Sequence, residues 1–376
     1  MAQKINLIVI LFFCLQPMLA QQKIPMIRAK SLNVDIRDAG ILQKNYWIID
    51  SNTKPDVYPT NNKNKEVTFY TDLDSISFTI EPDKKYEFII LVNGKDSAFT
   101  QIIYKPSFLD ILKSGENYNS NDKREFPEFS FQASDNPNLI ALRKAFNLDS
   151  IAGKGNDVSQ ILNLLHWIHN LVPHDGNHEN PFVRNAISML SVCEKEKRGL
   201  NCRGLSIVLN ECYLSLGIKS RHITCLPKDS TDIECHAINM VYAKSLNKWL
   251  WIDPTFDAYI KNEKGELLGI QEVRERLING KMLILNPDAN WNHKTPQTKE
   301  YYLENYMAKN LYILEIPINS QFDLETGEKG KVISYLRLLP LDYSKQKPDK
   351  SERKYLNGTT IIKYNTNNPD LFWQNP

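Results

Sequence analysis

The sequence predicts an α+β fold in which a helix packs on an antiparallel sheet, and a small β-sandwich precedes this core. Three observations support the prediction. Short strand-like runs separated by turn residues fill residues 22–115, as is usual in a β-sandwich. Apolar residues at helical spacing occupy residues 157–171 and recur from Gly204. Three strand-like runs follow between residues 218 and 252, so the second helix is expected to pack on a sheet.

Length and composition are those of a globular protein. The chain has 376 residues, enough for two or three domains at about 150 residues each. Hydrophobic residues make up 42% and charged residues 24%, which allows an ample core. The formal net charge is +2, and no long block of Lys and Arg stands out. Because nucleic-acid binding needs clustered basic residues, we expect no nucleic-acid partner.

The first 20 residues are predicted to be a secretory signal peptide, residues 1–20. Lys4 is their only charge, Ile5–Leu15 is almost wholly apolar, and Ala20 ends the segment before a polar pair. This pattern is typical of a signal that is cleaved after Ala20. The apolar run is too short for a membrane span, and no later stretch approaches the ~20 apolar residues that one needs. A secreted or periplasmic protein without a transmembrane segment is therefore expected.

Residues 22–115 are interpreted as a β-sandwich domain with a structural or binding role. Within them, Tyr86–Val92 and Phe99–Tyr104 flank Asn93–Gly94, a type I′ hairpin signal. A polar linker leads to a core over residues 124–290, with a helix-and-strand extension over 291–376.

Helices are expected at Pro137–Phe146 and Asp157–Leu171 in the core. His166 and His169 lie on the second of these, where a structural position is more usual than a catalytic one. The polar loop His174–Asn180 follows and is a weaker candidate for a contribution to a site.

Five cysteines remain beyond the signal: Cys193, Cys202, Cys212, Cys225 and Cys235. An odd number in an exported protein leaves at least one thiol unpaired, and Cys202 is the natural candidate. Cys225 and Cys235 flank a hairpin loop, so they either pair across it or are small buried side chains. A zinc site is disfavoured because no close Cys-x-x-Cys pair exists. We predict no metal and no cofactor.

Cys202, His236 and Asp253 each occupy a position that suits thiol catalysis. Cys202 begins the second helix, where unpaired backbone N–H groups and the helix dipole favour a thiolate. The same N–H groups can receive an oxyanion. His236 and Asp253 lie at the ends of two neighbouring strands, both distant from the connecting turn Lys244–Asn247. A hairpin of this length brings them together, so the histidine can accept the thiol proton while the aspartate orients it.

These segments resemble the transglutaminase-like superfamily, in the form of a secreted bacterial-type member, and its active-site logic is shared with papain-like cysteine proteases. The resemblance rests on Asn201–Gly204, Cys235–Tyr242 and Trp249–Thr255, and it covers about residues 155–260. It implies a transglutaminase-like core with Cys202 as nucleophile, His236 as base and Asp253 as orienting acid. Many members have glycine immediately before the cysteine, whereas Asn201 stands here.

The resemblance implies an acyl-thioester at Cys202 on a peptide or carboxamide substrate. Water as acceptor gives a peptidase or amidase, and an amine gives a cross-linking transamidase. Hydrolysis is favoured because water is abundant and no acceptor-lysine site is evident in the sequence. The expected substrate is peptide, protein or cell-envelope material. A catalytically inactive binding module is the remaining alternative.

Overall fold

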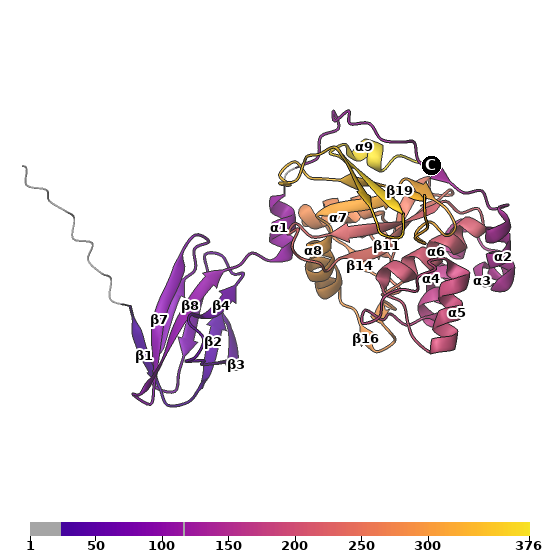
Figure 1. Cartoon of the computed structure of the whole chain (residues 1–376). Coiled ribbons are helices and arrows are strands. Elements are labelled where there is room, and N and C mark those ends of the chain that lie inside the picture. The colour runs from indigo at the N-terminus through magenta and orange to yellow at the C-terminus, as the bar shows by residue number, and fades with distance from the viewer. Residues whose placement is uncertain (1–23, 116) are drawn as a thin grey trace, which may run out of the picture. The chain divides into compact units, whose positions relative to one another are not determined.

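The computed structural model describes residues 24–115 and 117–376, in two compact units, Met1–Pro106 and Ser107–Pro376 (Figure 1). The signal peptide expected over residues 1–20 lies outside the described residues. No helix in the described part of the chain is long and apolar enough to cross a membrane. Each unit has its own hydrophobic core.

The first unit is a β-sandwich of two four-stranded sheets, with strand orders β1-β7-β8-β4 and β3-β2-β5-β6. Apolar side chains from both sheets, among them Ile36, Phe69 and Phe88, form one buried cluster. Asn93 and Gly94 have positive φ angles of 50° and 67°, as the predicted type I′ turn requires. The strands are β1 (Met26–Ala29), β2 (Asn33–Asp38), β3 (Ile41–Ile48), β4 (Asp56–Thr60), β5 (Glu66–Tyr70), β6 (Ser75–Thr79), β7 (Lys85–Val92) and β8 (Asp96–Tyr104).

The second unit is built on a seven-stranded sheet with the order β12-β11-β10-β17-β19-β21-β20. All neighbours are antiparallel except the parallel pair β19 and β21. The strands of this sheet are β10 (Ser220–Leu226), β11 (His236–Ala243), β12 (Lys248–Ile252), β17 (Ile313–Pro317), β19 (Val332–Leu338), β20 (Lys350–Lys354) and β21 (Thr360–Thr366). Short two-residue strands complete the unit: β9 (Ser130–Phe131), β13 (Ile260–Lys261), β14 (Ile284–Leu285), β15 (Asn290–Trp291), β16 (Thr295–Pro296) and β18 (Asn319–Ser320).

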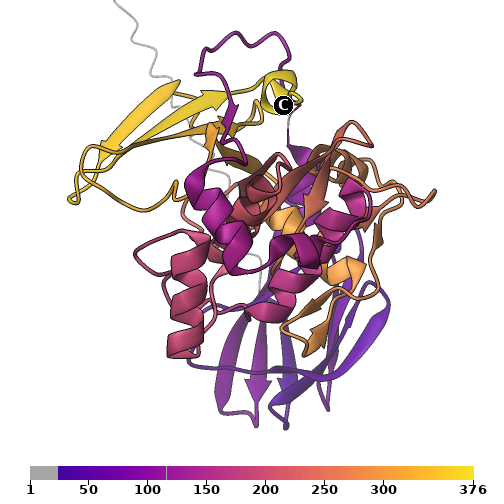
Figure 2. The same cartoon turned by 90° about the vertical axis from the view of Figure 1, so that its right-hand side faces the viewer.

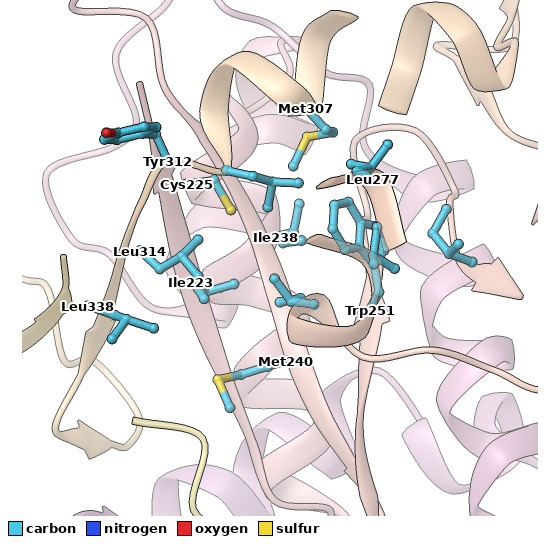
Figure 3. Close-up of a cluster of buried hydrophobic side chains, with 14 of the residues drawn as sticks. Ile223, Cys225, Ile238, Met240, Trp251, Leu277, Met307, Tyr312, Leu314 and Leu338 are labelled. Carbon is cyan, nitrogen blue, oxygen red and sulfur yellow. The ribbon is translucent and has the colours of Figure 1, made fainter. Parts of the chain in front are cut away.

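Helices cover both faces of the sheet, as Figure 1 and the turned view in Figure 2 show. The residues of α2 to α6 share one buried cluster with the β11–β12 hairpin, and α1, α7 and η1 share a second cluster on the other face. Figure 3 shows this second cluster, where Leu277 and Met307 meet Ile238, Met240 and Trp251 of the sheet. The helices are α1 (Phe108–Ser114), α2 (Pro137–Ala145), α3 (Leu148–Ala152), α4 (Asp157–Leu171), α5 (Ala186–Glu196), α6 (Cys202–Ser215), α7 (Ile270–Ile278), η1 (Glu300–Met307), α8 (Ala308–Asn310) and α9 (Pro369–Phe372).

Two domain boundaries differ from those expected. The first unit ends at Pro106 rather than near residue 115, because α1 packs into the second unit, where Leu112 is fully buried. The segment 291–376 was expected as an extension after a core over 124–290. It instead contributes four strands to the core sheet, with β17 directly beside β10.

The helix expected within the segment 291–376 is a π-helix, η1, that continues into α8. A π-helix forms i→i+5 hydrogen bonds and occurs frequently at functional sites. Here it carries Tyr302 and Tyr306 to the buried ends of the β11–β12 hairpin.

Candidate active site

Cys202 is the first residue of α6, as the sequence predicts. The Asn201 side chain caps the helix by accepting a hydrogen bond from the Gly204 backbone N–H at 3.1 Å. Asn180 holds this cap from the preceding loop: its amide donates to Asn201 Oδ1 at 2.7 Å and accepts from the Asn201 N–H at 3.2 Å. A Cβ atom at Gly204 would lie 2.4 Å from Asn180 Oδ1. Glycine is therefore required there, and the loop fixes the position of the thiol.

His236 and Asp253 meet at the end of the β11–β12 hairpin. His236 Nε2 lies 2.7 Å from Asp253 Oδ2, and both side chains are fully buried. The antiparallel register pairs Asn239 with Ile252, which places the two residues at the same end, as predicted. Asp253 is held by a hydrogen bond from the Thr255 backbone N–H to Oδ1 at 2.9 Å. The carboxylate is thus oriented toward the imidazole by its own turn.

The pKa of the Cys202 thiol is lowered and the pKa of His236 is raised. Burial raises the pKa of the thiol, but hydrogen bonds from His174, His236 and the backbone of Ala237, together with the charge of His236, lower it to about 6. Burial also lowers the pKa of His236, yet the negative charge and hydrogen bond of Asp253 raise it overall. Both shifts favour the same ion pair, so a thiolate beside an imidazolium is expected near neutral pH.

The other four cysteines lack this environment. All five thiols within the described residues are free. Burial raises the pKa of Cys193, Cys212, Cys225 and Cys235. The sequence left two alternatives for Cys225 and Cys235: a disulfide between them, or burial of both side chains. The structure shows neither, because both thiols are free and Cys225 is buried whereas Cys235 is exposed.

Three residues besides Cys202, His236 and Asp253 complete the surroundings of the site: two tyrosines that the sequence did not single out, and His174 of the polar loop that was a weaker candidate. Tyr302 donates a hydrogen bond from its hydroxyl to Asp253 Oδ2 at 2.6 Å. Tyr306 lies with its hydroxyl 3.1 Å from His236 Nδ1, the second nitrogen of the imidazole. His174 lies close enough to the thiol of Cys202 to lower its pKa. In the sequence, only the four-residue spacing of the two tyrosines and the polar loop that begins at His174 pointed to these residues.

His174 has a defined tautomer. The Trp291 indole N–H donates to its Nδ1 at 3.3 Å, so in the neutral ring the proton lies on Nε2. Asn292 fixes the backbone of the same residue by accepting from its N–H at 2.7 Å. The histidine therefore presents an N–H donor beside the thiol.

The two histidines of α4 brace the turn that follows Asp253, in agreement with their expected structural role. His169 is buried and bonds the Pro254 carbonyl oxygen and the side chain of Asn290, each at 3.1 Å. His166 Nδ1 lies 2.7 Å from a carboxylate oxygen of Asp257.

A buried ion network anchors the residue after the thiol. The Arg203 guanidinium donates to Glu325 at 2.8 and 2.6 Å and to Thr224 at 2.9 Å. His222 Nε2 lies 2.9 Å from the same carboxylate, and the Tyr335 hydroxyl donates to it at 2.9 Å. Burial raises the pKa of Glu325, but the charge of Arg203 and the hydrogen bonds from His222 and Arg203 hold it well below its usual range. Glu325 therefore ties the start of α6 to β10 and β19 as a carboxylate.

A cavity of about 430 Å³ opens beside the site. The hydroxyl of Thr255 is buried there without a hydrogen-bond partner among the described residues. None of the residues that line the cavity is acidic, Lys or Arg, and four are aromatic. They are His174, Thr255, Phe256, Trp291, Thr295, Pro296, Gln297, Thr298, Tyr301 and Tyr306.

The site thus brings together a thiol at a helix start and a buried histidine–aspartate pair at the ends of two neighbouring strands, an arrangement that suits thiol chemistry. Residues 144–254 match the family model of the transglutaminase-like superfamily. This core is transglutaminase-like, as the sequence motifs predicted, and the matched segment contains Cys202, His236 and Asp253.

Among the solved structures that are similar to the chain are a candidate cysteine protease and a transglutaminase. A candidate cysteine protease from Cytophaga hutchinsonii has 22% identity over 35% of this chain and 40% of its own, with a TM-score of 0.24. Red sea bream transglutaminase has 12% identity over 67% of this chain and 52% of its own, with a TM-score of 0.23. The chain thus spans only about half of these proteins. No curated protein matches it.

Proposed function

We propose that the protein is an exported cysteine hydrolase that cleaves an amide or peptide bond through an acyl-thioester on Cys202. The observation that carries the proposal is the joint arrangement of a thiol with a pKa of about 6 and a buried His236–Asp253 pair at 2.7 Å. A site with perturbed pKa values, beside a cavity, is typical of catalysis rather than of packing.

The reaction begins from the ion pair in which the thiol proton has already passed to His236. The Cys202 thiolate attacks the carbonyl carbon, and the oxyanion that forms receives hydrogen bonds from the N–H groups at the start of α6. His174, which helps to lower the pKa of the thiol, is a further candidate N–H donor to the oxyanion. The imidazolium then gives its proton to the leaving nitrogen as the carbon–nitrogen bond breaks, which leaves the acyl group on sulfur.

Water completes the cycle. His236 accepts a proton from a water molecule, which attacks the thioester carbon, and the carbon–sulfur bond breaks to release a carboxylic acid and the thiolate. Asp253 stabilises the imidazolium in both halves of the cycle. Because the adjoining cavity is aromatic and lacks acidic residues, it suits an apolar substrate side chain rather than a cationic amine acceptor. Hydrolysis is therefore favoured over transamidation.

Product analysis distinguishes the candidate functions. Wild type, Cys202→Ser and Cys235→Ser would be incubated with peptides that carry glutamine and aromatic residues, with and without a primary amine. We expect peptide cleavage or ammonia release without the amine in wild type and in Cys235→Ser, whose exposed thiol is the matched control. Cys202→Ser should give no detectable product.

Other outcomes would replace the proposal. Mass gain that requires the amine would identify a transamidase. Equal binding of a peptide by wild type and Cys202→Ser, without turnover in either, would identify a binding module.

A further inference from the structure

A second cavity, of about 420 Å³, lies along β10 and includes Phe129, Phe131, Lys219 and Arg221 in its lining. It shares no lining residue with the cavity beside Cys202. Arg221 pairs with Met240 of β11, four residues along the strand from His236. At roughly 3.3 Å per residue, this corresponds to about 13 Å along β11. The second cavity is therefore separate from the proposed active site.

Arg221 is buried yet has no anionic partner. Its residue exposure is 2%, and within residues 24–115 and 117–376 its guanidinium forms no ion pair, while its Nε has no hydrogen-bond acceptor. Arg203, by contrast, is paired with the carboxylate of Glu325. Burial alone lowers the pKa of Arg221 to about 9. A buried cation without a partner is uncommon, because desolvation is offset only by an opposing charge or hydrogen bonds.

Aromatic rings hold the guanidinium in place. Its central carbon lies 3.8 Å from the ring centroid of Phe129 and 4.4 Å from that of Phe131. Such stacking uses the flat face of the group and leaves its N–H edge for a ligand. The two rings thus hold the guanidinium in position before any ligand binds.

Charged groups of both signs surround the cavity. Lys219 lies directly before β10, two residues from Arg221, with its ammonium 5.6 Å from the Phe131 ring. Glu128 and the C-terminal residue Pro376 also line the cavity, so the two cations stand against two carboxyl groups. Because the charges of the lining balance, the flat shape of the Arg221 guanidinium, rather than an excess of charge, favours a planar monoanion over phosphate.

We propose that this cavity binds a carboxylate group, with the N–H edge of Arg221 taking its two oxygens and Lys219 at the mouth. The planar guanidinium matches a carboxylate in shape and can donate two parallel hydrogen bonds. The ligand is a small organic acid or the free carboxyl end of a peptide. The site does not depend on thiol chemistry, so it can be tested in the Cys202→Ala protein as well as in wild type.

Titration calorimetry on the full chain tests the proposal. N-acetylalanine, acetate, N-acetylalaninamide and inorganic phosphate would be compared at equal ionic strength. We expect both carboxylates to bind and the amide, which lacks the charge, not to bind. Tighter binding of N-acetylalanine than of acetate would indicate a peptide end, and equal binding would indicate a simple acid.

Substitutions place the binding at Arg221. Arg221→Met should weaken carboxylate binding at least tenfold, whereas Arg353→Met should leave it unchanged. Arg353 is the matched control because it also stacks on an aromatic ring, Tyr355, but is exposed. In wild type, the proposal is overturned if the acid and the amide bind alike, if no carboxylate binds, or if phosphate binds more tightly than both acids. It is also overturned if Arg221→Met binds carboxylates as tightly as wild type does. The comparison of acid with amide in wild type decides the matter even if Arg221→Met does not fold.

Discussion

Replacing His236 with alanine is expected to lower kcat/KM for amide cleavage by roughly 10⁴-fold or more, since removal of a catalytic base has an effect of this order. Without the imidazole, the Cys202 thiol loses its proton acceptor, and the leaving nitrogen loses its proton donor. Steady-state kinetics of wild type and variant, with thermal melting to verify folding, would measure the effect.

Two companion variants sharpen this measurement. Asp253→Asn should lose less activity than His236→Ala, because the base remains and only its orientation and charge stabilisation suffer. His178→Ala is the control, since His178 is an exposed histidine whose ring pairs with Asp175. Activity of His236→Ala equal to that of His178→Ala would mean that His236 takes no part in the chemistry.

The Glu325→Ala substitution is expected to lower the free energy of unfolding by about 3–5 kcal/mol, the usual effect of removing one partner from a buried ion pair. Arg203 and His222 would lose the carboxylate that now lies 2.6 and 2.9 Å from them. Urea denaturation followed by circular dichroism would give the difference. Glu263→Ala is the control, because Glu263 pairs with Arg276 at the surface, and such pairs contribute only about 0–1 kcal/mol.

The stability difference between wild type and Glu325→Ala is expected to become smaller as the pH falls. The pKa of Glu325 is depressed in the folded protein, chiefly by Arg203 once the opposing effect of burial is overcome. Its contribution to stability is therefore complete above the pKa of the unfolded chain and disappears as the pH falls through the lower, folded pKa. The gap between wild type and Glu325→Ala should narrow in strong acid. A gap that is constant down to the lowest pH, or no larger than that of Glu263→Ala, would contradict this role.

Much of the candidate site could be predicted because its parts have local signatures. The helix that begins at Cys202 has an asparagine cap and apolar residues at helical spacing, and both are visible in the sequence. The two strands of the β11–β12 hairpin are joined by a short turn, so their register follows from its length. Juxtaposition of His236 and Asp253 is a consequence of that register.

Residues that reach the site from distant segments could not be predicted. Tyr302 lies 49 residues beyond Asp253, and Glu325 lies 122 residues beyond Arg203. Their positions depend on how η1 and the loop before β19 pack, and no local pattern specifies this. The same reason explains why the position of the C-terminal strands in the core sheet was not predicted. Insertion of β17 beside β10 is a pairing of strands far apart in the chain, so 291–376 was interpreted as an extension rather than as part of the sheet.

The central claim is that Cys202 is a nucleophile activated by His236, and the pH profile of its alkylation tests this most directly. The full chain would be treated briefly with iodoacetamide at a series of pH values, and modification of each cysteine would be followed by peptide mass spectrometry. Since the pKa of Cys202 is lowered to about 6, its alkylation rate should reach half its maximum near that pH. In His236→Ala the midpoint should move upward. A midpoint near ~8.5, the value of an ordinary free thiol, or the same midpoint in wild type and His236→Ala, would contradict the account.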